Sequence, residues 1–200
     1  SCIDSREEIW LHPSGSGKAR ITVSLPSSAI ALGGGPDAIY SSIDEFLARQ
    51  PGVASITKQI TTSDNRSTID VSFQFTSALE LSSSMAKSAT DPNIPTPVRH
   101  FMGTTSLQRE GLALTGERVI DIGKVIPGSA FLSSAATNNR LQTILHLPLS
   151  PTDHNATRVE NEGRTLIWDI PLSTAMRAPL IQRVHVRAPA PLLAGISIAA

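Results

Sequence analysis

The chain has 200 residues, and its 17 basic and 17 acidic side chains give a formal net charge of zero at neutral pH. Neither sign clusters along the sequence, which excludes the strongly basic face typical of nucleic-acid-binding proteins. Hydrophobic residues make up 40% of the chain, so a largely disordered protein is excluded as well. This length is sufficient for one compact domain with a sizeable core.

The only cysteine of the sequence is Cys2, directly after Ser1. A single thiol excludes an intrachain disulfide and a zinc site built on several cysteines. Ser1-Cys2 also matches the end of a bacterial lipobox, where a signal peptide is cleaved before a cysteine that carries acyl chains such as palmitate. We therefore predict lipidation at Cys2, with residues 1–5 as lipobox end and linker. The alternative is a free thiol without a role.

A β-hairpin is predicted as the first folded element. Residues 18–25 alternate strictly between apolar and polar side chains, which is typical of a half-buried strand, and residues 7–12 form its partner. Pro13-Ser14-Gly15-Ser16-Gly17 supplies the turn. The run Gly15-Ser16-Gly17-Lys18 resembles part of a phosphate-binding loop, but the first glycine of that motif and its Ser or Thr after the lysine are missing.

A helix is predicted between Gly33-Gly34-Gly35 and Pro51-Gly52. Pro36 and Asp37 are residue types that favour a first helical turn. Four apolar side chains then recur at helical spacing and should pack on the sheet. They are Ile39, Ile43, Phe46 and Leu47.

A second hairpin and a second helix are predicted next. Residues 53–61 and 67–76 are the expected strands, joined by a turn at Ser63-Asp64-Asn65-Arg66. The return strand shows the cleanest period-two alternation in the chain. Ser77-Ala78-Leu79-Glu80 matches a capping box and starts a short helix that runs to about Lys87.

The remaining pattern indicates further antiparallel strands. Residues 112–114 and 118–125 are predicted to flank a turn at Thr115-Gly116-Glu117. Three later strands are expected at 141–147, 164–170 and 184–187, the last of them edge-like, with one helical turn at 173–177. Hairpins with helices between them predict an α+β fold: a mainly antiparallel sheet built from hairpins, with two short helices packed on it, forming a single domain over residues 6–187.

Residues 188–200 carry no charged side chain. Pro189 and Pro191 are typical of a stiff spacer, and the apolar residues after them have about two-thirds of the length that a membrane span requires. We expect a Pro-rich spacer and the start of a C-terminal transmembrane helix. The alternative is an apolar tail that docks on the domain.

No pattern in the sequence predicts an active site. The five histidines show no metal-binding spacing, and no nucleophile elbow occurs. Asp153 and His154 could serve a hydrolase only if a serine joined them in one cleft. We therefore expect no catalytic residues, no metal, no cofactor and no enzymatic activity. The histidines are His12, His100, His146, His154 and His185.

Several segments together resemble the LppM-like domain of poorly characterised bacterial lipoproteins. They are the Cys2-Ile3-Asp4 opening, the Trp10 strand with its Gly15-Ser16-Gly17 hairpin, Asn155-Ala156-Thr157, and Gly163-Arg164-Thr165-Leu166-Ile167-Trp168. The resemblance spans most of the chain, although residues 80–140 carry no matching motif. It implies a lipidated cysteine after a cleaved signal peptide, an extracytoplasmic α+β domain, and a membrane helix after a Pro-rich spacer.

These observations lead to three functional hypotheses. The first is a lipoprotein anchored in the cell membrane through Cys2 and facing the periplasm or the cell exterior, where it binds or scaffolds an envelope protein or lipid of unspecified identity. The second is a carrier of a lipid or other apolar ligand in a cavity between sheet and helices, unless the same side chains fill a solid core. Those side chains are Ile39, Ile43, Phe46, Val71, Phe73 and Phe75. The third is the hydrolase.

Overall fold

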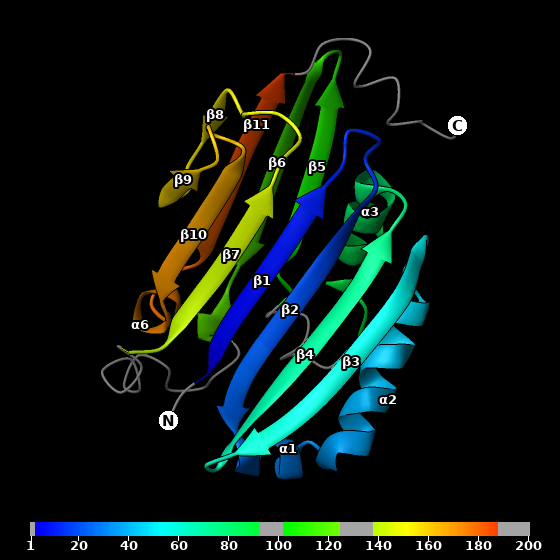
Figure 1. Ribbon diagram of the computed structural model, residues 1–200, viewed down its shortest axis with the longest axis vertical. Coiled ribbons are helices and arrows are strands. Elements are labelled where there is room, and N and C mark those ends of the chain that lie inside the picture. The colour runs from blue at the N-terminus through cyan, green and yellow to red at the C-terminus, as the bar shows by residue number, and fades with distance from the viewer. Residues whose placement is uncertain (1–2, 93–101, 125–137, 188–200) are drawn as a thin grey trace.

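The computed structural model describes residues 3–92, 102–124 and 138–187. In this part of the chain a large twisted β-sheet forms one layer, and helices together with a smaller sheet cover one of its faces (Figure 1). We call the covered face of the large sheet the inner face and the opposite face, which is turned toward the viewer in Figure 1, the outer face.

The large sheet has seven strands in the order β3-β4-β2-β1-β7-β10-β9. All neighbours pair antiparallel except β1 and β7, which are parallel. The strands are β1 (Asp4–Leu11), β2 (Gly17–Pro26), β3 (Val53–Ser63), β4 (Arg66–Phe75), β7 (Arg140–His146), β9 (Arg158–Glu160) and β10 (Thr165–Pro171).

The smaller sheet has four strands in the order β5-β6-β11-β8, all antiparallel. They are β5 (Thr104–Glu110), β6 (Ala113–Ile120), β11 (Leu180–Arg187) and β8 (Asp153–His154). The predicted α+β class with mainly antiparallel pairing is confirmed. The prediction of a single sheet is wrong, because the chain continues from β10 into β11, which pairs with β6 and not with the large sheet.

Four α-helices lie in the described residues: α1 (Ser27–Leu32), α2 (Gly35–Ala48), α3 (Ala78–Ser88) and α6 (Leu172–Ala175), with a short 3₁₀ helix η1 (Ile122–Lys124). The two predicted packing helices are α2 and α3, and α1 is additional. Pro36 lies in the first turn of α2, as expected. The side chain of Ser77 accepts a hydrogen bond of 3.2 Å from the backbone NH of Glu80, so the predicted cap of α3 forms.

Two strand predictions need correction. Thr115-Gly116-Glu117 is not a turn, because all three residues lie inside β6 and pair with β5 and β11. The turn lies earlier, at Gly111, whose φ is +58°. The strand predicted at 184–187 is not at an edge either, since β11 begins at Leu180 and lies between β6 and β8.

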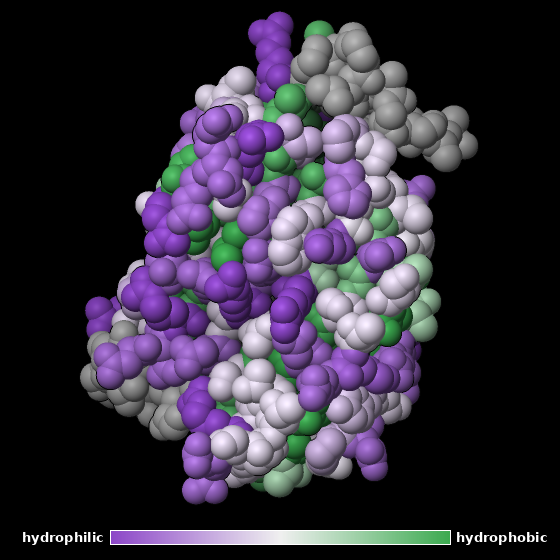
Figure 2. All heavy atoms as spheres, in the orientation of Figure 1, coloured by the Kyte–Doolittle hydropathy of each residue, from purple (hydrophilic) through white to green (hydrophobic). Residues whose placement is uncertain are grey.

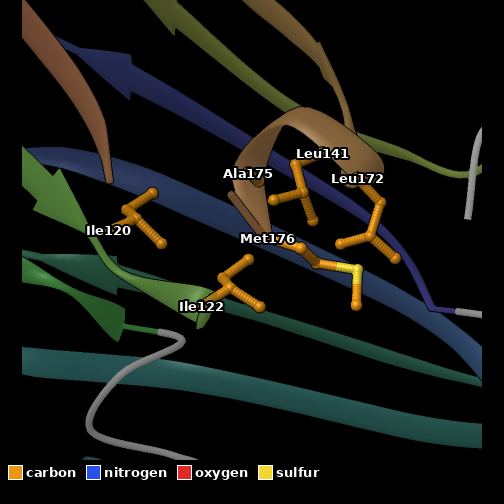
Figure 3. Close-up of a cluster of buried hydrophobic side chains, with 6 residues drawn as sticks. All are labelled: Ile120, Ile122, Leu141, Leu172, Ala175 and Met176. Atoms are coloured by element: carbon orange, nitrogen blue, oxygen red, sulfur yellow. The ribbon is translucent and has the colours of Figure 1, made fainter. Parts of the chain in front are cut away.

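The hydrophobic core has two clusters of buried side chains. One joins α2 to the inner face of β2 and β4, where Leu47 packs with Val71, Phe73 and Phe75. The other, which we call the base cluster, joins β6 and η1 to β7 and α6 (Figure 3). Its members are Ile120, Ile122, Leu141, Leu172, Ala175 and Met176.

Candidate functional site

An apolar cavity of about 200 Å³ lies between the two sheets. Inner-face side chains of β1, β2, β4, β7 and β10 form one wall, and β5, β6 and β11 form the opposite wall. The first turns of α3 close one side with Ala78, Leu81 and Met85. Most of the lining is aliphatic or aromatic, because period-two alternation directs the apolar residues of each strand toward the same side.

Part of the wall of this cavity is only half-buried, although other lining residues, such as Phe73 and Phe75, are buried and also belong to the cluster under α2. Ile9, Leu145 and Val184 are half-buried although each lies on the inward side of its strand. Gly116 adds to the space, because it occupies an inward position of β6 without a side chain. A Cβ at Gly116 would lie 3.1 Å from Cγ1 of Val184 and 3.4 Å from Cδ1 of Leu107, its partners on the neighbouring strands of the smaller sheet, so a side chain there would crowd this wall. The space between the walls therefore stays unfilled at these positions.

Two polar bridges cross between the sheets among the residues that line this cavity. Glu7 of β1 forms an ion pair with Arg118 of β6, and each side chain is only 15% exposed. Nε of Arg118 also donates a hydrogen bond of 2.9 Å to the carbonyl oxygen of Met102. Gln182 of β11 donates through Nε2 to Oγ1 of Thr143 on β7 at 2.9 Å, and both residues are buried. These bridges hold the sheets together at fixed points.

Trp168 contributes the large aromatic side chain of the cavity. Its Nε1 donates to Oδ1 of Asn155 at 3.0 Å, and the same oxygen accepts a hydrogen bond from the backbone NH of Arg183 at 2.7 Å. Nδ2 of Asn155 donates to the carbonyl oxygen of Ile181. Asn155 therefore connects β10 to β11. It also provides an acceptor for the indole NH, because burying this donor without a partner would cost free energy.

The outer face of the large sheet is polar, with hydrophobic surface confined to small separate patches (Figure 2). The indole of Trp10 stacks on His146 with 5.1 Å between ring centroids and 10° between ring planes. Nζ of Lys18 lies 4.4 Å from the centroid of Trp10. Because Lys18 and His146 pair with Trp10 from the two neighbouring strands, the indole is flanked on both sides. It is not a free stacking surface for a ligand.

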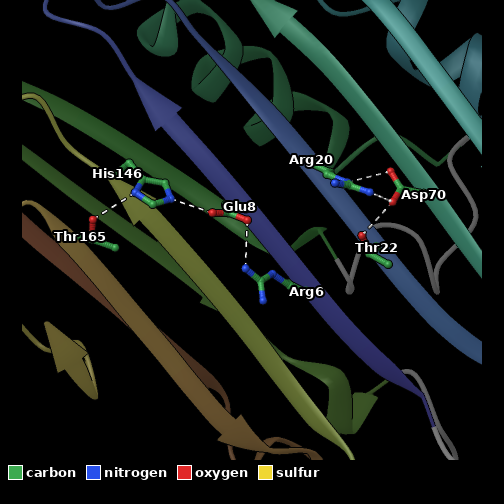
Figure 4. Close-up of polar contacts among 7 residues, drawn as sticks. All are labelled: Arg6, Glu8, Arg20, Thr22, Asp70, His146 and Thr165. Atoms are coloured by element: carbon green, nitrogen blue, oxygen red, sulfur yellow. Dashed lines mark hydrogen bonds and ion pairs between the residues drawn. The ribbon is translucent and has the colours of Figure 1, made fainter. Parts of the chain in front are cut away.

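A chain of hydrogen bonds crosses the same face from Glu8 to Thr165 (Figure 4). Oε1 of Glu8 lies 2.8 Å from Nε2 of His146, and Nδ1 of His146 lies 3.1 Å from Oγ1 of Thr165. The order carboxylate, imidazole, hydroxyl is that of a catalytic triad. Thr165, however, is only 3% exposed, and its Oγ1 accepts a hydrogen bond from Asn161. This chain connects β1, β7 and β10 and presents no accessible nucleophile.

Glu8 makes the stability of this face depend on pH. Burial raises the pKa of Glu8, but hydrogen bonds from His146 and Arg6 outweigh burial, so the pKa lies below its ordinary value of 4.5. The stabilisation is therefore complete above that value and is lost as the pH falls through the lower pKa of the folded state. We expect Glu8→Gln to cost about 1 kcal/mol at pH 7 and less at pH 3.

Urea unfolding of the wild type and the Glu8→Gln variant at pH 7, 5 and 3 measures this difference. Gln keeps one oxygen, which can accept only one of the two hydrogen bonds that Glu8 receives on its two oxygens, so the variant removes the charge together with one acceptor. A difference in unfolding free energy that grows toward pH 3 would contradict the assignment.

Of the six side chains predicted to line a ligand cavity, only Phe73 and Phe75 do so. Ile43, Phe46 and Val71 pack in the cluster between α2 and the large sheet without lining the cavity, whereas Phe73 and Phe75 belong to both. The cavity lies between two sheets and α3, and not between a sheet and α2, because α2 covers only the end of the large sheet that carries β3 and β4. Sequence reasoning missed this location because it predicted one sheet.

Asp153 and His154 are adjacent in β8, so their side chains point to opposite faces and do not form a catalytic pair. Nδ1 of His154 accepts a hydrogen bond from the backbone NH of Ala156. The nearby Ser150 donates to the carbonyl oxygen of Glu162. The structure thus does not bring together the residues of the hydrolase hypothesis.

Among the described residues, no three or more His, Cys, Asp or Glu side chains gather in a way that could hold a metal ion. Within the same ranges, none of the helices has the length and apolar character needed to cross a bilayer. The predicted lipidation site Cys2, His100, and the predicted spacer and membrane helix at 188–200 lie outside the described residues, so these expectations stay predictions.

Comparison with known proteins identifies a likeness of fold. No family model and no curated protein match the sequence. A Mu homology domain of Fcho1 from Danio rerio, solved with a bound Eps15 peptide, aligns over 94% of this chain and 80% of its own at 14% identity, but its TM-score of 0.30 is too low to support an inference. The NMR structure of the folded domain of LppM from Mycobacterium tuberculosis aligns over 94% of this chain and 91% of its own at 14% identity, with a TM-score of 0.50. The chain thus has a fold similar to that of the LppM folded domain.

Proposed function

We propose that this domain binds an acyl chain in the cavity between its two sheets. The observation that carries the proposal is the cavity itself, which is apolar along both walls although the same chain packs a closed base cluster elsewhere. A solid core would have been the expected outcome of sheet-on-sheet packing. The proposal assigns binding or carriage of a ligand, and no catalysis.

The size of the cavity favours a slender ligand. An engineered apolar cavity of about 150 Å³ binds benzene, whereas pockets for drug-sized ligands span roughly 300–1,000 Å³. At about 200 Å³ this cavity suits a single chain of moderate length. Each buried methylene contributes about 0.8 kcal/mol, and the entropy cost of association is subtracted from the total. We therefore expect a linear C8 probe to bind in the micromolar to millimolar range.

The test uses Trp168 as a reporter. The sequence contains two tryptophans, so Trp10→Phe leaves Trp168, which lines the cavity, as the only indole. Titration of this variant with 1-octanol should give a saturable change in Trp168 fluorescence. Adding Ile9→Phe should weaken octanol binding at least about tenfold, because the larger ring would occupy part of the cavity next to β1.

The matched control is Ile56→Phe, the same substitution on the edge strand β3, where Ile56 is 36% exposed. It should leave octanol binding unchanged. A fluorescence change that rises linearly without saturation would contradict the proposal. An equal effect of the two substitutions on octanol binding would contradict it as well.

The second candidate function concerns where this domain works. The Ser1-Cys2 lipobox end, the uncharged tail and the LppM-like fold support a lipoprotein of the cell envelope, anchored through Cys2 and facing away from the cytoplasm. In that setting the domain would bind or scaffold envelope lipids or proteins. Mass spectrometry of the N-terminal peptide from protein isolated from its native membrane should show an acylated Cys2. An unmodified Cys2 there would contradict this assignment.

A further inference from the structure

The polar groups that line the cavity include one ion pair. Glu7 lies on the inward side of β1, on the same side as Ile9 and Leu11, and Arg118 lies on the inward side of β6. Their charged ends meet between the sheets, and each side chain is 15% exposed. A ligand that fills the cavity therefore lies against this pair.

The charges that face the cavity cancel. Among the described lining residues, only Glu7, Glu117 and Arg118 are charged. Glu117 is exposed and adjacent to Arg118 in β6, so its side chain points to the other face of the smaller sheet. One carboxylate and one guanidinium remain, and they already neutralise each other. The other polar pair, Thr143 with Gln182, is uncharged.

We infer that the cavity selects an amphiphile with an uncharged polar head, such as a hydroxyl, over the carboxylate of the same chain length. This inference rests on the proposed binding of an acyl chain. A carboxylate beside Glu7 and Arg118 would leave one negative charge uncompensated in an apolar site, which is strongly unfavourable. A hydroxyl carries no charge, and it can donate to Glu7 and accept from neutral donors.

The test compares 1-octanol with octanoate at pH 8 in the Trp10→Phe protein. We expect octanoate to bind at least about tenfold more weakly than octanol. Octylamine, which brings a positive charge, should also bind more weakly than octanol. Octanoate binding as tightly as octanol, or more tightly, would overturn the inference while leaving acyl-chain binding intact. The absence of saturable octanol binding would instead contradict the proposed function itself.

A charge variant separates this explanation from the ordinary preference of a carboxylate for water. Glu7→Gln removes the negative partner and leaves Arg118 unneutralised, so the ratio of octanoate to octanol affinity should rise at least about tenfold. Glu117→Gln, which removes the same charge on the opposite face, should leave the ratio unchanged. An unchanged ratio in Glu7→Gln, or an equal rise in both variants, would contradict the inference. If Glu7→Gln does not fold, the three probes on the Trp10→Phe protein still decide the question.

Discussion

Replacing Ile122 by alanine is expected to lower the free energy of unfolding by about 2–5 kcal/mol. Ile122 is 1% exposed and lies within the base cluster, where side chains of β6, η1, β7 and α6 meet (Figure 3). The substitution removes the apolar contact and leaves a void, because the strands and α6 around it can close only in part. For a chain of this size, the melting temperature should fall on the order of 10 °C.

The matched control is Ile181→Ala, the same chemical change at a residue of β11 that is 48% exposed. It should cost less than about 1 kcal/mol, because little apolar surface leaves water at that position. Urea unfolding followed by tryptophan fluorescence measures both variants. Equal losses would show that the base cluster is not a well-packed core.

Local patterns were sufficient to predict the N-terminal half of the fold. The strict alternation in β2 and β4 depends only on which side of the sheet is apolar, and the structure places Ala19, Val71, Phe73 and Phe75 on the same inner face. The turn between β3 and β4 also follows from local chemistry, since Asp64 and Asn65 both adopt positive φ. The cap of α3 at Ser77 forms for the same reason.

The second half depends on pairings between distant segments, and these leave no local signal. β11 pairs with β6 although β7, β8, β9 and β10 lie between them in the sequence. β1 pairs in parallel with β7, which no hairpin pattern predicts. Gly116 predicts a turn because glycine favours turns, whereas here it lies inside β6, where a side chain would crowd Val184 of β11 and Leu107 of β5. The second sheet was therefore not foreseen.

The location of the cavity between two sheets could not be predicted because each of its walls, taken alone, has the pattern of an ordinary core face. One signal was present in the sequence. Glu7 shares its side of the strand with Ile9 and Leu11, and Arg118 shares its side with Leu114 and Gly116. A charge at an inward position of an alternating strand requires a buried partner of opposite charge. Two such positions with opposite charge indicate that the two strands face each other.

Gly17→Ala is expected to destabilise the protein by about 3 kcal/mol or more, because the new methyl group has no room, and not because of the backbone conformation of Gly17. A Cβ at Gly17 would lie 2.1 Å from the carbonyl oxygen of Trp10 and 2.6 Å from Cζ of Phe75. The carbonyl belongs to β1 and the phenyl ring to β4, so strands on both sides of β2 meet the new methyl group. Neither can move without breaking ladder hydrogen bonds or the cluster under α2.

The control for this prediction is a glycine with a left-handed backbone conformation and open surroundings. Gly111, between β5 and β6, has a φ of +58°, and a Cβ there would meet nothing within 4 Å. Gly111→Ala should therefore cost only the strain of a left-handed residue, about 1 kcal/mol. Urea unfolding of the two variants compares crowding with backbone strain directly. A smaller loss of unfolding free energy in Gly17→Ala than in Gly111→Ala would mean that β1 and β4 can separate around β2. The close approach of these strands would then not constrain the cavity wall that they form.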